Sequence, residues 1–548
     1  MGKKSYRAFL SMVLILMLAG SGWYLLAGCG NKTVSETTPP TTIAPPAYSP
    51  VNLSDSVKMG PWLVSYGDPQ AMLIRVALYK DCSHDDMTDG SVSVYDLEGN
   101  KVTGSPFKLA PFKKTEQTEN GKFVRFGYYP PHWDNSSNDI PTPWWIHLLE
   151  AQITGLSPAT TYTYVIHHPV LSSPDTITAS FKTPPPVGST NKVVFYAYGD
   201  NRKWHNVTYG ESQFPKVEET MVDDMADRSF VIHVGDASNL GWWLNYTPEA
   251  RQLGWQAEYL RSSNDKEWQK HVWLRANYPT FMSVGNHELK RKTGVTQFYP
   301  EDHAMYDFIM GNFSRYKLGN ALSFTYDSEN PFSNSLTYEG TSSAQTYEGT
   351  FDSQTYMTDW GDLRIINLNT YFCFTDSDLT NLKSKLKMWV TGRKAAGKPT
   401  ILALHSPIFW DGDGGETGYK LDSQNKIRDE IIPIIQDDVN LVLSGHKHVT
   451  TRTKEIYYEK DKTITIGAGK GPVYYILGTG GAQDMTTPTV PPKYSDVLTT
   501  TKEKSLSDYA WAKFTVDYTA GKIIGDIKSG NLEKNPREVI DHYEIPFK

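Results

Sequence analysis

The chain has 548 residues, of which 54 are lysine or arginine and 61 are aspartate or glutamate, so its formal net charge is −7. This length allows two to four domains of about 150 residues each and excludes a peptide-sized or metal-stapled fold. The acidic balance argues against nucleic acid as a general partner, because nucleic-acid binding normally needs an excess of cations. Only three cysteines are present. A disulfide scaffold and a thiolate zinc site are therefore excluded, and any metal chemistry must use His, Asp, Glu and Asn.

Residues 1–28 have the pattern of an export signal. Lys3, Lys4 and Arg7 precede an apolar run over 9–26, and small residues then lead to Cys29. The segment resembles the bacterial lipobox, which implies cleavage, a lipid on Cys29 and a membrane anchor. An uncleaved N-terminal membrane helix is the alternative. Both interpretations place the rest of the chain outside the cytoplasm.

Residues 29–50 are rich in Thr and Pro, which predicts a stiff spacer. Over 51–186 short alternating runs are separated by turn residues, without a long helical period, and this predicts an antiparallel β-sandwich. Its closing strands, near 153–164 and 180–184, resemble those of a fibronectin type III-like domain. Three prolines at 184–186 mark its end, because they cannot continue a strand ladder. The sequence leaves open whether Cys82 and Cys373 pair or are two buried thiols.

From residue 191 to 548, apolar strands alternate with helical patterns, which predicts an α/β domain. Helices are expected at 214–226, 377–394 and 426–439, and late strands at 473–478 and 512–517. The region 298–358 is a long insertion rich in Ser, Thr, Tyr and Gly. It contains the sequence TYEGT twice, which indicates hairpins.

Polar residues with metal-binding side chains follow five of the apolar strand runs. In chain order they are Asp200, Asp236, Asn286 with His287, His405, and His446 with His448. Open α/β sheets build their sites at such strand ends. Two divalent ions about 3.5–4 Å apart need O and N donors and a shared anionic bridge, which we assign to Asp236. Strand alternation is expected to turn His446 and His448 to the same side, with Lys447 pointing away.

The order and the strand-end placement of these residues resemble the calcineurin-like metallophosphoesterases. The preceding sandwich narrows the resemblance to the purple acid phosphatase branch, and it extends over most of the chain after residue 50. The fold it implies is an N-terminal all-β sandwich followed by an α/β metallophosphoesterase domain. In that domain two mixed sheets pack face to face and helices flank them.

The resemblance also implies a role for each site residue. Asp200 and His448 would join Asp236 on one metal ion, and Asn286, His405 and His446 would join it on the other. His287 would lie over the phosphate as a catalytic group. Apart from the resemblance, the guanidinium of Arg202 has no lone pair for a metal ion, and we expect it to clamp a phosphate oxygen. The two ions would be drawn from Fe, Zn and Mn, and the ligand set does not choose among them. Two sets of histidines lack such a motif and are given no role in the site. We expect structural or surface positions for His84, His132, His147, His167, His168 and His233, and structural roles for His271 and His303.

The chain departs from the family pattern at one metal. Purple acid phosphatases carry a tyrosine three residues after the second-motif aspartate, and here that residue is Asn239. Other metallophosphoesterases have a histidine two residues after the first aspartate, where this chain has Arg202. Asn239, His205 or water would fill the position. A neutral donor in place of a phenolate favours a divalent ion and predicts a colourless enzyme.

The activity expected from the resemblance is metal-dependent hydrolysis of phosphomonoesters, as in an acid phosphatase, with a hydroxide held by the two metals attacking phosphorus in line. A phosphodiesterase or nucleotidase using the same site is the alternative, and the acidic, aromatic loop at 409–416 is a candidate pocket lining. A non-enzymatic surface module is the alternative of another class. The intact ligand set argues against such a module, because relic enzymes commonly lose ligands first.

Overall fold

The computed structural model describes residues 48, 50–51, 53, 56–79, 89–111, 146–171, 176–201, 214–225, 229–237, 266–288, 355–372, 376–410, 424–467, 469–481, 497–498, 509–530 and 537–547. The expected export signal with Cys29, the spacer up to residue 47, Cys82, Cys373 and the insertion up to residue 354 lie outside these ranges. Within them, no helix combines the length and the apolar character needed to cross a membrane.

The N-terminal part consists of antiparallel strands. They are β1 (Val57–Val64), β2 (Met72–Tyr79), β3 (Gly90–Tyr95), β4 (Phe107–Pro111), β5 (Ile146–Ile153), β6 (Thr161–His167) and β7 (Thr176–Lys182), paired in the order β1-β2-β5-β4-β3-β6-β7. Leu73 and Ile74, which are neighbours on β2, belong to two different buried clusters because successive side chains point to opposite faces. The strands agree with the all-β prediction for this part.

The first sheet of the α/β part has the order β10-β9-β8-β20-β21-β22. Its strands are β8 (Val193–Tyr198), β9 (Phe230–His233), β10 (Thr280–Met282), β20 (Ala510–Asp517), β21 (Lys522–Ser529) and β22 (Val539–Pro546). Strands β8, β9 and β10 are parallel and buried along their whole length, whereas the other pairs are antiparallel. Burial on both faces explains why these three strands read as continuous apolar runs.

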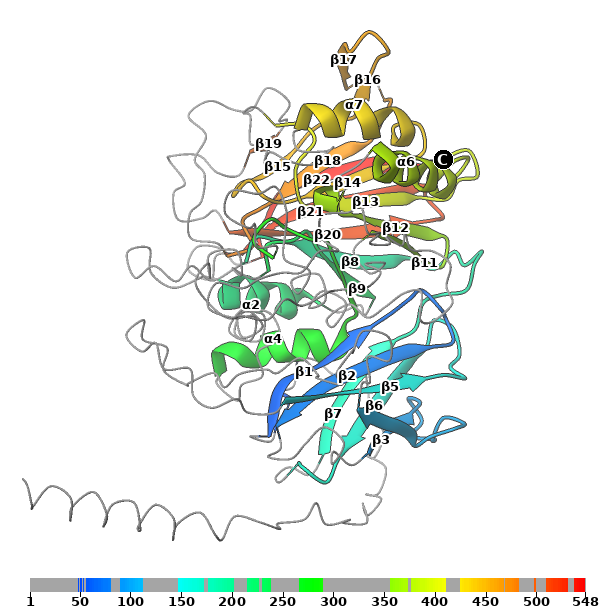
Figure 1. Cartoon of the computed structure of the whole chain (residues 1–548), viewed down its shortest axis with the longest axis vertical. Helices are drawn as coiled ribbons and strands as arrows, with labels where there is room; N and C mark the ends of the chain where they lie inside the picture. The colour runs from blue at the N-terminus through cyan, green and yellow to red at the C-terminus, as the bar shows by residue number, and fades with distance from the viewer. Residues whose placement is uncertain are drawn as a thin grey trace, which may run out of the picture.

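The second sheet has the order β11-β12-β13-β14-β18-β15-β19. It contains β11 (Tyr356–Trp360), β12 (Leu363–Leu368), β13 (Thr400–Leu404), β14 (Leu441–Ser444), β15 (Thr450–Arg452), β18 (Val473–Leu477) and β19 (Val497–Leu498). Strands β12, β13, β14 and β18 are parallel and the outer pairs antiparallel, so this sheet is also mixed. A separate hairpin consists of β16 (Ile456–Tyr458) and β17 (Ile464–Ile466), and it projects from the molecule at the top of Figure 1.

The two sheets pack against each other, with helices outside. Phe195 and Phe514 of the first sheet share a buried cluster with Leu443 and Tyr475 of the second. Helices α6 (Asp376–Val390) and α7 (Gln424–Ile435) cover the outer face of the second sheet, and α2 (Phe214–Asp224) and α4 (Lys266–Asn277) lie against the first (Figure 1). The predicted arrangement of two mixed sheets flanked by helices is confirmed.

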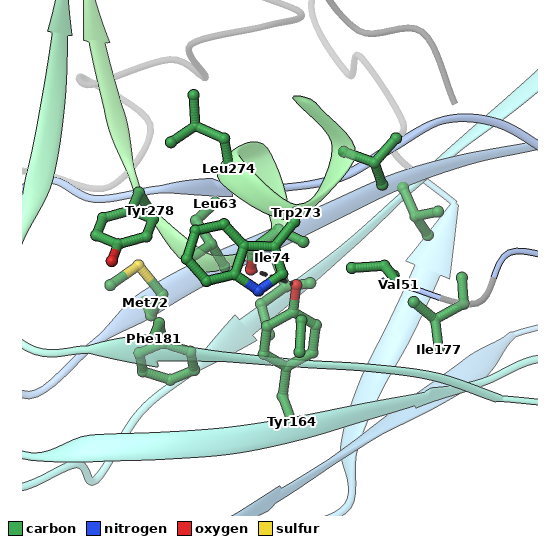
Figure 2. Close-up of a cluster of buried hydrophobic side chains, with 14 of the residues drawn as sticks. Val51, Leu63, Met72, Ile74, Tyr164, Ile177, Phe181, Trp273, Leu274 and Tyr278 are labelled. Atoms are coloured by element: carbon green, nitrogen blue, oxygen red, sulfur yellow. Dashed lines mark hydrogen bonds between the residues drawn. The ribbon is translucent and has the colours of Figure 1, made fainter. Parts of the chain in front are cut away.

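Helix α4 has no counterpart in the predicted elements. Its buried residues Val272, Trp273 and Leu274 adjoin one another instead of recurring every three or four positions, as they would on a helix with one apolar face. The reason is its position, because α4 is covered on one side by the first sheet and on the other by the N-terminal strands. Figure 2 shows Trp273 and Leu274 beside Leu63 and Ile74.

Polar contacts also join α4 to the N-terminal strands. The Tyr164 hydroxyl on β6 donates a 2.7 Å hydrogen bond to the Ala276 carbonyl oxygen. The side-chain oxygen of Asn277 accepts hydrogen bonds from the backbone N–H of Ser180, at 3.0 Å, and from its hydroxyl, at 2.9 Å. The apolar and polar contacts together make α4 part of both cores.

Candidate metal centre

The six predicted metal-binding side chains come together where strands of both sheets end. Asp200, Asp236 and Asn286 follow β8, β9 and β10 of the first sheet, and His405 and His446 follow β13 and β14 of the second. Backbone hydrogen bonds hold these ends to their neighbours, with Asp200 N–H donating to Gly235 O at 3.0 Å and Gly445 N–H to His405 O at 2.9 Å. The parallel strands of the two sheets thus present their carboxyl ends to one site.

One group of donors consists of Asp200, Asp236 and His448. One ligand atom from each lies within 4.8 Å of the other two, and all three residues are buried. His448 Nε2 is 3.5 Å from Asp200 Oδ1. Two buried carboxylates and an imidazole at this spacing can surround a single cation.

A second group consists of Asn286, His405 and His446. The side-chain oxygen of Asn286 is 3.0 Å from His405 Nε2 and 3.0 Å from His446 Nδ1. Asp236 reaches this group as well, because its Oδ1 is 3.2 Å from His405 Nε2. Asp236 therefore contacts both groups, in the position expected of a bridge.

The local electrostatics at His405 favour a positive charge. Its Nδ1 lies 2.8 Å from the Val234 carbonyl oxygen, so this nitrogen carries a proton and Nε2 faces the oxygens of Asn286 and Asp236. Burial lowers the pKa of His405, but the carboxylates of Asp236 and Asp200 outweigh that effect and raise it to about 9. A proton or a cation between Nε2 and these oxygens relieves the repulsion of their lone pairs. The donor set therefore fits a metal ion.

Three of the site residues have backbone angles that side-chain-bearing residues rarely adopt. The φ angles of Asp200, Asp236 and His446 are 55°, 54° and 68°. Such left-handed conformations cost of order 1–3 kcal/mol each and persist where the surroundings impose them. At these positions the conformation turns each side chain from the end of its strand into the site.

Glycines allow the loops to approach one another closely. A Cβ atom on Gly285 would overlap Asp236 Oδ1, and one on Gly445 would overlap Asp200 Oδ2. Each of these glycines directly precedes a site residue. Their role is therefore steric, since the carboxylates occupy the space that a side chain would need.

His446 and His448 reach the site by a route that differs from the predicted one. The segment after β14 is bent and not extended, with Lys447 N–H donating to Gly445 O at 2.8 Å and Val449 N–H to Lys447 O at 2.6 Å. The expected strand alternation is therefore wrong, because the segment closes two successive three-residue turns. Both imidazoles nevertheless lie in the site, His446 beside Asn286 and His448 beside Asp200.

His287 lies at the edge of the cluster. Its backbone N–H donates to Asp236 Oδ1 at 3.0 Å, and its Nε2 is 3.8 Å from Asp236 Oδ2. Its side chain is 11% exposed, whereas that of Asp236 is 1% exposed. The imidazole therefore lies near Asp236 and is still accessible from outside the cluster.

Two buried residues that the sequence did not mark as part of the site contact its loops. Glu288 accepts hydrogen bonds from the backbone N–H groups of Asp236 and Gly285. His233, expected to be structural, hydrogen-bonds to the side-chain oxygen of Asn201, the residue next to Asp200. The adjacency of Glu288 to Asn286 and His287 was a usable signal. No such signal marks His233 in the sequence, because its hydrogen-bond partner Asn201 lies 32 residues away in the chain.

Arg202, His205, Asn239 and residues 411–416 of the candidate lining lie outside the described residues.

Comparison with known proteins identifies part of the chain. Residues 194–450 match the model of the calcineurin-like phosphoesterase family. A purple acid phosphatase isolated from yellow lupin (Lupinus luteus) seeds is similar in structure, with a TM-score of 0.55 and 16% identity over 88% of this chain and 73% of that chain. At this identity the likeness shows a shared fold.

Two further comparisons show no relationship to the chain. A family 123 glycoside hydrolase from Clostridium perfringens aligns over 70% of this chain and 62% of its own, at 9% identity and a TM-score of only 0.13. No curated protein matches the chain. The family match, which contains all of the site residues from Asp200 to His448, shows that residues 194–450 belong to a calcineurin-like metallophosphoesterase domain.

Proposed function

We propose that this chain is a metal-dependent hydrolase of phosphomonoesters, acting in the manner of an acid phosphatase. The observation that carries the proposal is the convergence of two donor groups on Asp236. Asp200 and His448 lie on one side of it, and Asn286, His405 and His446 on the other. Such a pair of adjoining sites suits two divalent ions with a shared carboxylate.

The two divalent ions would be Fe, Zn or Mn, since imidazole, amide and carboxylate donors suit all three metals. When bound, they would supply positive charge to the phosphoryl oxygens and lower the pKa of a water molecule, so that hydroxide is available to attack phosphorus. Asn239 or His205 would complete the donor set around the ion at Asp200.

The surrounding side chains would then act on the substrate. His287, beside Asp236 and partly exposed, would hold a proton on Nε2 and donate it to the departing alkoxide oxygen. Arg202 would form a bidentate contact with the phosphate, because the planar guanidinium group offers paired N–H donors. It cannot bind a metal ion itself, since it has no free lone pair. The buried backbone of Asp236 and Asp200 would keep the charged groups in a fixed arrangement.

The place of action that we propose is the outer face of a cell membrane. The basic start, the apolar run and the small residues before Cys29 support export and a lipid anchor at that residue. Replacing Cys29 with serine should abolish labelling by a radioactive or clickable fatty acid. A wild-type protein without lipid would favour the uncleaved N-terminal helix.

The assay that tests the activity compares p-nitrophenyl phosphate with bis-p-nitrophenyl phosphate, before and after removal of metals with a chelator. We expect turnover of the monoester that is lost with the metals and restored by added Zn²⁺ or Mn²⁺. Preferential turnover of the diester would overturn the monoester assignment. Absence of turnover by metal-loaded protein on either ester would favour a non-enzymatic surface module.

A further inference from the structure

Three loops that carry site residues are tied together by two buried side chains. We refer to residues 199–201, 235–237 and 285–288 as the ligand loops, because they contain Asp200, Asp236 and Asn286. His233 and Glu288 are both fully buried, at 0% exposure. Each of them makes hydrogen bonds that connect two of the three loops.

His233 connects the first loop to the second. Its Nδ1 accepts the backbone N–H of Gly235 at 3.1 Å, and its Nε2 lies 2.5 Å from the side-chain oxygen of Asn201. An imidazole that accepts at Nδ1 must carry its proton on Nε2, so Nε2–H donates to Asn201. The ring therefore spans the residues next to Asp200 and Asp236.

Glu288 connects the second loop to the third. A single carboxylate oxygen, Oε2, accepts the backbone N–H of Asp236 at 2.9 Å and that of Gly285 at 2.6 Å. Both donors are main-chain groups of the segments that place Asp236 and Asn286. The carboxylate therefore fixes the distance between the bridging residue and the loop of the second donor group.

The ring of His233 also packs against a buried hydrogen-bond network formed by Tyr198, Glu218 and Arg275. Tyr198 meets this ring edge-on, with ring centroids 4.8 Å apart, and the Tyr198 hydroxyl donates to Glu218 at 2.5 Å. Arg275 of α4 donates to both groups, at 2.8 Å to Tyr198 and 2.9 Å to Glu218. The imidazole cannot swing away from the ligand loops without disturbing this buried network.

We propose that His233 and Glu288 are positioning residues that hold the three ligand loops in register, so that metal affinity and turnover depend on them although neither touches substrate. This inference rests on the proposed function, because it assigns these residues to the same site. Asp200 and Asp236 are held at φ angles of 55° and 54°, from which an unsupported loop would relax. Loss of a residue that orients metal ligands typically costs 10–100-fold in affinity or activity.

The experiment compares substitutions that break the hydrogen bonds with one that keeps them. His233→Phe keeps the ring volume but neither accepts from Gly235 nor donates to Asn201. Glu288→Leu removes the acceptor, whereas Glu288→Gln keeps a carbonyl oxygen that can accept both N–H groups. Asn201→Ser breaks the His233 bridge from its other end and alters no large buried side chain.

Gln436→Leu is the matched control. Gln436 also bonds two backbone groups, accepting from Tyr458 N–H at 2.9 Å and donating to Tyr458 O at 3.1 Å. It lies between α7 and β16, away from the ligand loops. This substitution should lower the unfolding temperature without changing metal binding.

The measurements are the dissociation constant of Mn²⁺ for chelator-treated protein by calorimetry, kcat and KM for p-nitrophenyl phosphate at saturating metal, and the unfolding temperature. For His233→Phe and Glu288→Leu we expect Mn²⁺ affinity to fall about 10–100-fold. We expect kcat to fall about 10²-fold, as for ångström-scale misplacement, with KM changed less than about threefold. Glu288→Gln should restore both metal affinity and kcat to within about tenfold of wild type, and Asn201→Ser should weaken metal binding.

The outcomes separate this inference from the proposed function. If the wild type binds metal and hydrolyses the ester while His233→Phe and Glu288→Leu behave like Gln436→Leu, the positioning role is refuted and the function stands. If those two variants do not fold, wild-type Mn²⁺ affinity in Asn201→Ser refutes the role of His233. A wild type that neither binds metal nor hydrolyses phosphoesters refutes the function and the positioning role with it.

Discussion

Replacing Asp236 with asparagine removes the negative charge that the two donor groups share. Asp236 Oδ1 is 3.2 Å from His405 Nε2, in a site where Asp236 is 1% exposed. At an effective dielectric constant of about 20, a unit positive charge at this distance loses about 5 kcal/mol of attraction, which corresponds to about 10³–10⁴-fold in binding. The substitution hardly changes the side-chain volume. The backbone N–H of His287, which donates to Asp236 Oδ1 at 3.0 Å in the wild type, can still donate to the amide oxygen of asparagine. We therefore expect a folded protein with at least about 10³-fold lower kcat/KM.

The assay is steady-state hydrolysis of p-nitrophenyl phosphate together with elemental analysis of the purified variant. Asp526→Asn serves as the control, because that carboxylate pairs with the exposed His542 on the outer strands β21 and β22. The control should keep wild-type metal content and turnover within about twofold. An Asp236→Asn protein with full metal content and substantial turnover would refute the bridge assignment and the electrostatic argument behind it.

Four further predictions follow from the same geometry. His287→Ala should retain both metals and lose about 10²–10⁴-fold in kcat, and a lost ion on elemental analysis would make His287 a ligand. Gly445→Ala should displace Asp200, whose Oδ2 a Cβ would overlap, and lower kcat about 10²-fold; unchanged kinetics would contradict the close packing. In chelator-treated protein, burial lowers the pKa of His405 but Asp236 and Asp200 raise it overall from 6.5 to about 9. The protonated form of His405 therefore stabilises the folded state fully below about pH 6.5, and this stabilisation disappears as the pH rises through 9. The unfolding temperature of the wild type should fall across this pH window, whereas that of His405→Asn should stay level. A level wild-type profile would contradict the charge assigned to His405. Active enzyme with two divalent ions should lack a tyrosinate-to-iron absorption band, whereas a purple preparation would show that a tyrosine replaces Asn239 as ligand.

The strand ends that build the site were predictable because each one combines two local signals. A buried parallel strand is a continuous apolar run, and the polar residue that stops it must lie at the sheet edge. This reasoning placed Asp200, Asp236 and His405 at one site although up to 205 residues separate them in the chain.

The features that escaped prediction depend on tertiary contacts. The turns around Lys447 form because Asp200 accepts the His446 N–H, at 2.9 Å to Oδ2, and Asp200 comes from the other sheet. Helix α4 was missed because its two-sided burial erases the helical period. The hydrogen bond of His233 was not predictable either, because nothing near His233 in the sequence shows that its partner would be Asn201. In each case the deciding neighbour is distant in the chain.

The buried cluster that α4 shares with both parts of the chain decides whether the N-terminal strands can be separated from the α/β part. Trp273 and Leu274 pack with Leu63 and Ile74 of the N-terminal strands (Figure 2). The same buried cluster includes Tyr196 of the first sheet. A fragment that begins after residue 186 would expose that apolar face of α4 to water, at roughly 25 cal/mol for each Å² uncovered. The N-terminal strands are therefore not an exchangeable module. Calorimetry should show them unfolding with the two sheets of the α/β part in one transition.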